Sequence, residues 1–147
     1  SNAKSDLESE IARLTDNGYI MPEQAKSLSR DKLKTLFESD FASRMFNADK
    51  IYREIKVSSY VPVNQIEDTQ YTDSVLIQGI ADCVFEENGE LVLVDYKTDR
   101  VSSEEELLDL YKNQIAFYRK AVEKTLKKPV KEAVLYSFAL NKICIYK

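Results

Sequence analysis

The feature that constrains the fold most is a hairpin signal in the middle of the chain. Two runs rich in β-forming residues, 75–86 and 90–98, flank the pair Asn88-Gly89. This pair favours a tight hairpin because both turn positions need positive φ angles. A two-residue loop and a four-residue loop over 87–90 predict the same register, in which Glu87 faces Glu90. We therefore expect two antiparallel strands whose pairing extends residue by residue from this turn.

The register of this hairpin predicts a cluster of charged side chains. Asp82 is expected directly opposite Asp95, with Cβ atoms about 4.5–5.5 Å apart. Lys97 is expected on the same sheet face as Asp95, about 6.6–6.8 Å further along the strand. The neighbouring positions expected on that face are all apolar: Ile80, Val84, Leu91 and Leu93. Two opposed carboxylates in such a setting repel unless one is protonated or a cation lies between them.

This cluster has a chemical interpretation and a structural one. Paired carboxylates suit a hard divalent ion such as Mg²⁺ or Mn²⁺, and a lysine beside them stabilises developing negative charge, so the set fits metal-assisted phosphodiester hydrolysis. The structural alternative is an ion pair between Asp95 and Lys97, with Asp82 at a solvated end of the sheet. The apolar run 91–94 that leads into the pair, and Gly79 three residues before Asp82, favour the chemical interpretation.

The remaining pattern predicts an α/β domain. Amphipathic spacing predicts helices within residues 4–50, and one helical region from about residue 29 carries Leu33, Leu36, Phe37, Phe41 and Met45. Further elements follow from period, turn residues and capping signals: strands at 51–62, 75–86, 90–98, 130–139 and 142–146, and a long helix from Ser103 that ends before Pro129. We expect one domain, with residues 1–3 resembling a purification-tag scar, 4–50 a helical N-terminal region and 51–147 a mixed sheet with a crossover helix.

Composition removes several functional classes. Histidine is absent and the only cysteines are Cys83 and Cys144, which excludes His-dependent triads and Cys-rich metal sites within this chain. The cysteines are interpreted as buried residues of a cytosolic protein. With 21 basic and 25 acidic residues, net −4, a nucleic-acid role needs a local basic surface or bridging cations. No apolar run reaches the roughly 18 residues that a membrane helix needs, so no membrane partner is expected.

Three motifs together resemble a known family. The segment 79–82 (GIAD), the segment 94–99 (VDYKTD) and the segment 114–118 (QIAFY) are similar to the motifs of PD-(D/E)XK nucleases of the RecB-like group. The resemblance implies a restriction-endonuclease-like fold and a Mg²⁺- or Mn²⁺-dependent deoxyribonuclease with DNA as its partner. No Walker-type phosphate loop is present, so ATP is not expected to bind to this chain.

Residue roles follow from the resemblance. It implies that Asp82 and Asp95 are metal ligands and catalytic residues, and that Lys97 is the catalytic lysine. Gln114 and Tyr118 are four residues apart on one helix face and would line the site; the alternative is a buried, hydrogen-bonded Gln and a core Tyr. Tyr111, on the same helix stripe, is expected in the core. Glu54 is either an additional acidic group near the site or a surface strand residue.

The resemblance extends to the C-terminal nuclease domain of AddA-type (RexA-type) helicase–nuclease subunits. It runs from about Leu7 and includes residues 17–20, 23–25 and 53–55. It implies a bacterial cytoplasmic exonuclease domain that processes double-strand breaks for recombinational repair, with the partner subunit of an AddAB-type complex. RecB-like nucleases usually carry a metal-binding His upstream, and this chain has none, so we expect that the fragment begins after that helix. The alternative function is a nuclease-like module that binds DNA or protein without cleavage.

Overall fold

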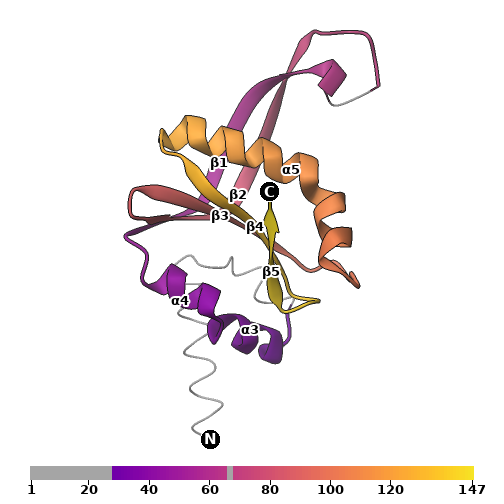
Figure 1. Cartoon of the computed structure of the whole chain (residues 1–147). Coiled ribbons are helices and arrows are strands. Elements are labelled where there is room, and N and C mark those ends of the chain that lie inside the picture. Colours follow the sequence, from indigo (N-terminus) through magenta and orange to yellow (C-terminus); the bar gives the residue numbers. More distant parts are fainter. Residues whose placement is uncertain (1–27, 66–67) are drawn as a thin grey trace, which may run out of the picture.

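The fold is a five-stranded mixed sheet with helices on both faces (Figure 1). The computed structural model describes residues 28–65 and 68–147. The sheet has the spatial order β1-β2-β3-β4-β5. The elements are α3 (Arg30–Phe37), α4 (Asp40–Phe46), β1 (Lys50–Pro62), the short 3₁₀ helix η1 (Val63–Gln65), β2 (Ser74–Glu87), β3 (Glu90–Lys97), α5 (Glu104–Leu126), β4 (Val130–Ser137) and β5 (Lys142–Tyr146). The predicted α/β class and the crossover helix are confirmed.

The hairpin between β2 and β3 has the predicted register. Asn88 and Gly89 adopt φ angles of 52° and 81°, and Glu87 pairs with Glu90. The pairs β1–β2, β2–β3 and β4–β5 are antiparallel, whereas β3 and β4 are parallel and are joined by α5. A parallel pair needs such a crossover connection, and this crossover places α5 over one face of the sheet.

The helical region before the sheet differs from the prediction of one helix after residue 29. The structure divides it into α3 and α4, because Ser39 caps a new helix by accepting a hydrogen bond from the amide of Ala42 at 3.1 Å. Ser residues favour this position because the hydroxyl satisfies an amide that has no partner within the helix. The helices expected before residue 28, and the segments 17–20 and 23–25, lie outside the described residues.

The long helix begins and ends where the sequence predicts. Ser103 accepts from the amide of Glu106 at 3.2 Å, and the Glu106 carboxylate accepts from the amide of Ser102 at 2.9 Å. This reciprocal arrangement is a capping box. The helix ends at Lys127, whose φ of 55° lies in the left-handed region. Among the described residues, no helix combines the length and apolar character of a membrane span.

Two apolar cores lie on the two faces of the sheet. One core joins the sheet to α3 and α4, and it includes Leu36, Met45, Phe85 and Tyr136. The other joins the sheet to α5, with Leu93, Ile115 and Val122 among its members. The candidate site residues lie at the edge of this second core.

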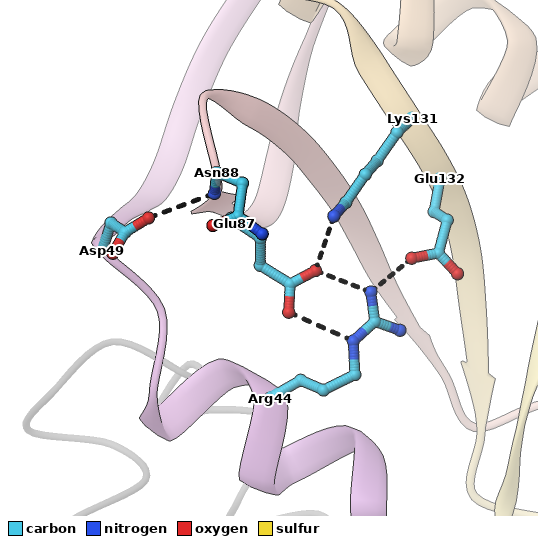
Figure 2. A network of polar contacts seen from close by, with 6 residues as sticks. All are labelled: Arg44, Asp49, Glu87, Asn88, Lys131 and Glu132. Carbon is cyan, nitrogen blue, oxygen red and sulfur yellow. Dashed lines mark hydrogen bonds and ion pairs between the residues drawn. The ribbon is translucent and has the colours of Figure 1, made fainter.

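A group of four charged side chains ties α4 to the sheet, and we call it the Arg44 network (Figure 2). Arg44 donates to both carboxylate oxygens of Glu87, at 2.8 and 3.2 Å, and also to Glu132. Lys131 lies 3.0 Å from the same Glu87 carboxylate. The guanidinium also lies over the rings of Phe41 and Phe85 in the core below. The network fastens the hairpin end of β2 to α4 and β4.

Candidate active site

The first two strands exchange faces at one step, and this step positions the candidate site. Before Glu54, Tyr52 of β1 packs toward α5; after it, Ile55 and Val57 do so. Glu54 itself has a φ of 48°, a left-handed value that interrupts the alternation of a strand. The β1–β2 register is the same on both sides of Glu54, so β2 exchanges faces at the same level.

Asp82 lies on β2 at this step. Its neighbours in register on β1 are the residues on either side of Glu54, since Arg53 pairs with Cys83 and Ile55 pairs with Ala81. The ladder between β2 and β3 ends at the pair of Cys83 and Val94. Beyond it, the amide of Tyr96 donates to Asp82 Oδ2 at 3.0 Å. The Asp82 carboxylate is thus held by the backbone of the strand that carries Asp95.

The face exchange corrects one expectation about the surroundings of Asp82. Regular alternation predicts Ile80 on the same buried face, but 50% of its surface is exposed. Instead, Ala81 is buried in the core beneath α5, as Val84 is on the other side of the step. A regular strand would place residues 81 and 84 on opposite faces. The irregular step leaves the carboxylate of Asp82 only partly covered, at the edge of this core.

Asp95 is the most strongly perturbed carboxylate of the described chain. It is 5% exposed, and its Oδ2 is buried without a hydrogen bond to any described residue. Lys97 Nζ lies 3.0 Å from this oxygen as an ion pair. The pKa of Asp95 rises to about 7, first because burial disfavours its charged form, then because of the hydrogen bond and charge of Asp82; Lys97 opposes the rise. The two carboxylates therefore lie close together, with less positive charge than they require.

Two residues of α5 hold the ammonium group of Lys97. Gln114 accepts a hydrogen bond from Lys97 Nζ at 2.8 Å. The ring of Tyr111 lies beneath the same nitrogen, with its centroid at 3.8 Å. The Tyr111 hydroxyl donates to Asp99, whose two carboxylate oxygens both lie at 2.9 Å. Burial and then this carboxylate raise the pKa of Tyr111.

Tyr118 lies one turn further along α5 and close to the carboxylates. Its pKa is raised first by burial and then by the charges of Asp95 and Asp82. Its ring lies against the backbone of Gly79, where an added Cβ would come within 2.7 Å of Tyr118 Cε1. A glycine at residue 79 is what allows the ring to approach this closely. The spacing of Gly79 and Asp82 on β2 thus places the aromatic ring and the carboxylate in one site.

The structure brings most of the predicted residues together. Asp82, Asp95, Lys97, Gln114 and Tyr118 form one group at the edge of the second core. Gln114 is exposed rather than buried, which removes the core interpretation of its side chain. Glu54 is exposed on β1 at the level of Asp82, and its role stays a prediction.

Sequence reasoning places Tyr111 in the core and gives Asp99 no role. Tyr111 is instead half-buried beneath the ammonium group of Lys97. The available signal is the position of Asp99 two residues after Lys97, at the end of the strand that carries the charged cluster. No spacing rule connects that position to a residue of α5, so only the packed helix shows the pair.

The donor set suits a cation that completes its coordination elsewhere. Among the described residues, no group of three or more His, Cys, Asp or Glu side chains could hold a metal ion. Asp82 and Asp95 are therefore a pair of ligands and not a closed cage. Mg²⁺ is often bound by one or two carboxylates, with water and substrate phosphate as its other ligands.

A mixed sheet that presents two carboxylates and a lysine beneath a crossover helix defines a phosphodiesterase-like class of site. The family comparison agrees: the model of the PD-(D/E)XK nuclease superfamily matches residues 2–143. The chain belongs to this nuclease superfamily.

The curated relatives that match this chain are A-type subunits of ATP-dependent helicase/nucleases. The relative from Clostridium kluyveri is 38% identical over 142 residues, covering 93% of this chain and 12% of the relative. The relative from Bacillus mycoides is 34% identical over 149 residues, covering 93% and 12%. This chain therefore spans a small part of the relatives' length. The solved structure of SSO0001 aligns with 94% of this chain and 60% of its own, with a TM-score of 0.45 and 14% identity.

Proposed function

We propose that this chain is a metal-dependent DNA nuclease domain, with Asp82 and Asp95 as metal ligands and Lys97 as the catalytic lysine. One observation carries the proposal: Asp95 is buried against a second carboxylate, and its Oδ2 has no hydrogen bond to any described residue. A purely structural ion pair gains nothing from that arrangement, whereas a bound cation would relieve it. Family membership supports the nuclease class.

A divalent ion fits these residues. The two Asp side chains supply hard oxygen donors, which Mg²⁺ and Mn²⁺ prefer, and the partly open setting of Asp82 leaves room for water and a phosphate. When bound, such an ion polarises the phosphate and lowers the pKa of water.

The chain's own residues then have distinct tasks. The Tyr96 amide and the sheet register hold Asp82 beside Asp95. Lys97 faces the same position and offers its ammonium group to the charge that develops on the phosphate oxygens. Gln114, through its hydrogen bond to Lys97, keeps that group from rotating away. Tyr118 covers the apolar side of the site, and Glu54 is proposed to lie at its rim.

The wider setting is proposed from the description of the relatives. A helicase/nuclease subunit implies a longer protein in which an ATP-driven motor delivers DNA to this domain. In that setting the domain acts as an exonuclease in the bacterial cytoplasm, with a partner subunit, during recombinational repair of double-strand breaks.

Metal titration with thermal unfolding tests the site directly. Mg²⁺ or Mn²⁺ should raise the melting temperature of this chain, with a gain of about 2.7 kcal/mol when the metal is at a hundredfold excess over its Kd. Asp95→Asn and Asp82→Asn should abolish this shift. Asp109→Asn, a change at an exposed residue of α5, should leave it intact. An unchanged shift in both site variants would locate the ion elsewhere.

Cleavage is assayed in the same preparations, with labelled DNA in the presence of Mg²⁺ or of EDTA. Metal-dependent product that disappears in Asp95→Asn supports the proposal. A chain that binds the metal and DNA but never cleaves supports the alternative of a nuclease-like binding module. Cleavage that persists in EDTA would contradict the metal-dependent mechanism.

A further inference from the structure

A groove lies beside the candidate site, between the β1–β2 ribbon and α5. The groove has a volume of about 440 Å³, in the range of sites that hold one small ligand. Its strand side includes Ile77 and Gln78 of β2, and its helix side includes Asn113, Phe117 and Lys120. Figure 1 shows the ribbon extending past α5 at this end of the molecule. The groove therefore combines apolar walls with amide and ammonium groups.

The groove is continuous with the candidate site. Gln114 and Tyr118 line it, and these are the residues that contact Lys97 and lie near Asp95, respectively. One turn of α5 thus faces the carboxylates and the groove together. A strand that places one phosphate at Lys97 would have its next nucleotide at the mouth of the groove.

The charge of the groove complements a polyanion. The chain has 25 acidic residues, yet none of those in the described ranges lines the groove. Lys120 is exposed at its edge and makes no ion pair with another residue that the structure describes. The second groove of the described chain differs, since Glu104, Glu105 and Asp109 line it at the start of α5.

We propose that the groove binds one unpaired nucleotide of the DNA strand, adjacent to the phosphate that is cleaved. The base packs between Ile77 and Phe117, where an apolar wall faces an aromatic ring, and Lys120 contacts the phosphate on the far side. Gln78 and Asn113 offer donors and acceptors that suit any base. The inference rests on the proposed nuclease function, since it takes the site at Lys97 as the position of the reacting phosphate.

Equilibrium binding without metal separates the base from the charge. The probes are a fluorescein-labelled oligothymidylate and an oligomer of equal length made of abasic deoxyribose phosphates, measured by anisotropy in EDTA. We expect the unmodified chain to bind the thymidylate about tenfold more tightly, because stacking of one base on an aromatic side chain contributes this order of affinity. Ala116→Trp, which fills the groove from α5, should remove the preference. Equal affinities for the two probes, or no binding of either, would overturn the proposal.

Lys120→Glu tests the phosphate contact. It should weaken binding of both probes and reduce the slope of log affinity against log salt by about 0.7, the change expected for one lost contact to a single strand. Lys34→Glu, the same change on α3 at the opposite face, should leave slope and affinity unchanged. A slope that stays constant in Lys120→Glu contradicts the assigned contact.

Failure of the groove and failure of the nuclease proposal give different results. Ala116→Trp and Lys120→Glu should keep the Mg²⁺-induced rise in melting temperature, because neither residue belongs to the metal site. Base preference without any metal-dependent cleavage would contradict the proposed function and leave the groove supported. Cleavage that is as fast in both variants as in the unmodified chain, at limiting DNA, would contradict the groove alone.

Discussion

The Arg44 network and the candidate active site are both charged clusters on this sheet, but they differ in balance. In the Arg44 network two carboxylates meet two cations, and Arg44 bonds to both Glu87 and Glu132. The pKa of Glu87 is lowered, chiefly by its hydrogen bond to Arg44. Each charge in the network has an opposite charge within reach, as in a cluster that serves packing.

The candidate site has the opposite balance. Two carboxylates share one ammonium group, and the pKa of Asp95 is raised to about 7 rather than lowered. The ammonium group of Lys97 has only one carboxylate partner within ion-pair distance among the described residues, and its other contacts, with Gln114 and Tyr111, are neutral. A charge deficit combined with a cation held by neutral groups is typical of a site that completes itself with a ligand.

The largest contrast should come from removing one lysine from each cluster. Lys97→Ala should lower DNA cleavage by a factor of about 10²–10³, because a donor that stabilises transition-state charge is lost. Lys131→Ala, which removes a cation from the Arg44 network, should leave the cleavage rate per folded molecule unchanged. Both rates should be measured with the full helicase–nuclease and its partner subunit, with helicase activity as the internal control. Wild-type cleavage by folded Lys97→Ala would refute the assignment of this lysine.

The second prediction concerns the pH dependence of the metal-free chain. Because the folded-state pKa of Asp95 lies above its ordinary value of 3.8, the folded state binds a proton more tightly than the unfolded state. This stabilisation is complete below about pH 4 and is lost as the pH rises through about 7. The elevation corresponds to a ceiling of about 4 kcal/mol. Asp95→Asn should remove this loss and unfold later than the wild type at pH 8 in EDTA.

The control is Glu87→Gln in the Arg44 network. The pKa of Glu87 is lowered in the folded state, so its contribution is present above its ordinary pKa of 4.5 and is lost as the pH falls. This variant should therefore be less stable than the wild type at pH 8. Denaturant unfolding at pH 4 and pH 8 measures both variants. If Asp95→Asn were destabilised at pH 8 without metal, the charge deficit at the site would be wrong.

Arg44→Met should show the structural cost of unbalancing the other cluster. The change leaves Glu87 and Glu132 without their main partner while keeping much of the contact with Phe41 and Phe85. Because these carboxylates are partly exposed, water replaces part of the lost interaction, and we expect a loss of about 1–3 kcal/mol in the free energy of unfolding. The Mg²⁺-induced shift in melting temperature should persist. A loss of metal binding in this variant would couple the two clusters.

The sequence predicted the parts of the site that depend on local geometry. Asn88-Gly89 defines a turn, and the turn defines a register, so the opposition of Asp82 and Asp95 could be counted from the letters alone. The direction of Ile80 could not, because it depends on the left-handed step at Glu54, which no residue type at that position announces. A glutamate adopts such a φ only when its surroundings impose it.

The contacts of α5 were predicted by face but not by partner. Helical period places Tyr111, Gln114 and Tyr118 toward the sheet, and the structure agrees. Which charged group lies beneath each residue depends on how far the helix slides along the sheet. That position is set by the length of the loop after β3 and by the close approach of Tyr118 to Gly79, neither of which a periodic pattern encodes.

The smallest effect should come from the neutral groups that hold Lys97. Tyr111→Leu removes the ring beneath the ammonium group and should lower the turnover of DNA cleavage about fivefold, the order expected for one cation–π contact. Tyr111→Phe keeps the ring and loses only the hydroxyl that donates to Asp99, so it should retain most of the turnover. Because the ring orients Lys97 without neutralising it, the Leu variant should change kcat more than KM and should keep the Mg²⁺-induced shift. Equal turnover in the Leu and Phe variants would mean that the hydroxyl, and not the ring, positions the lysine.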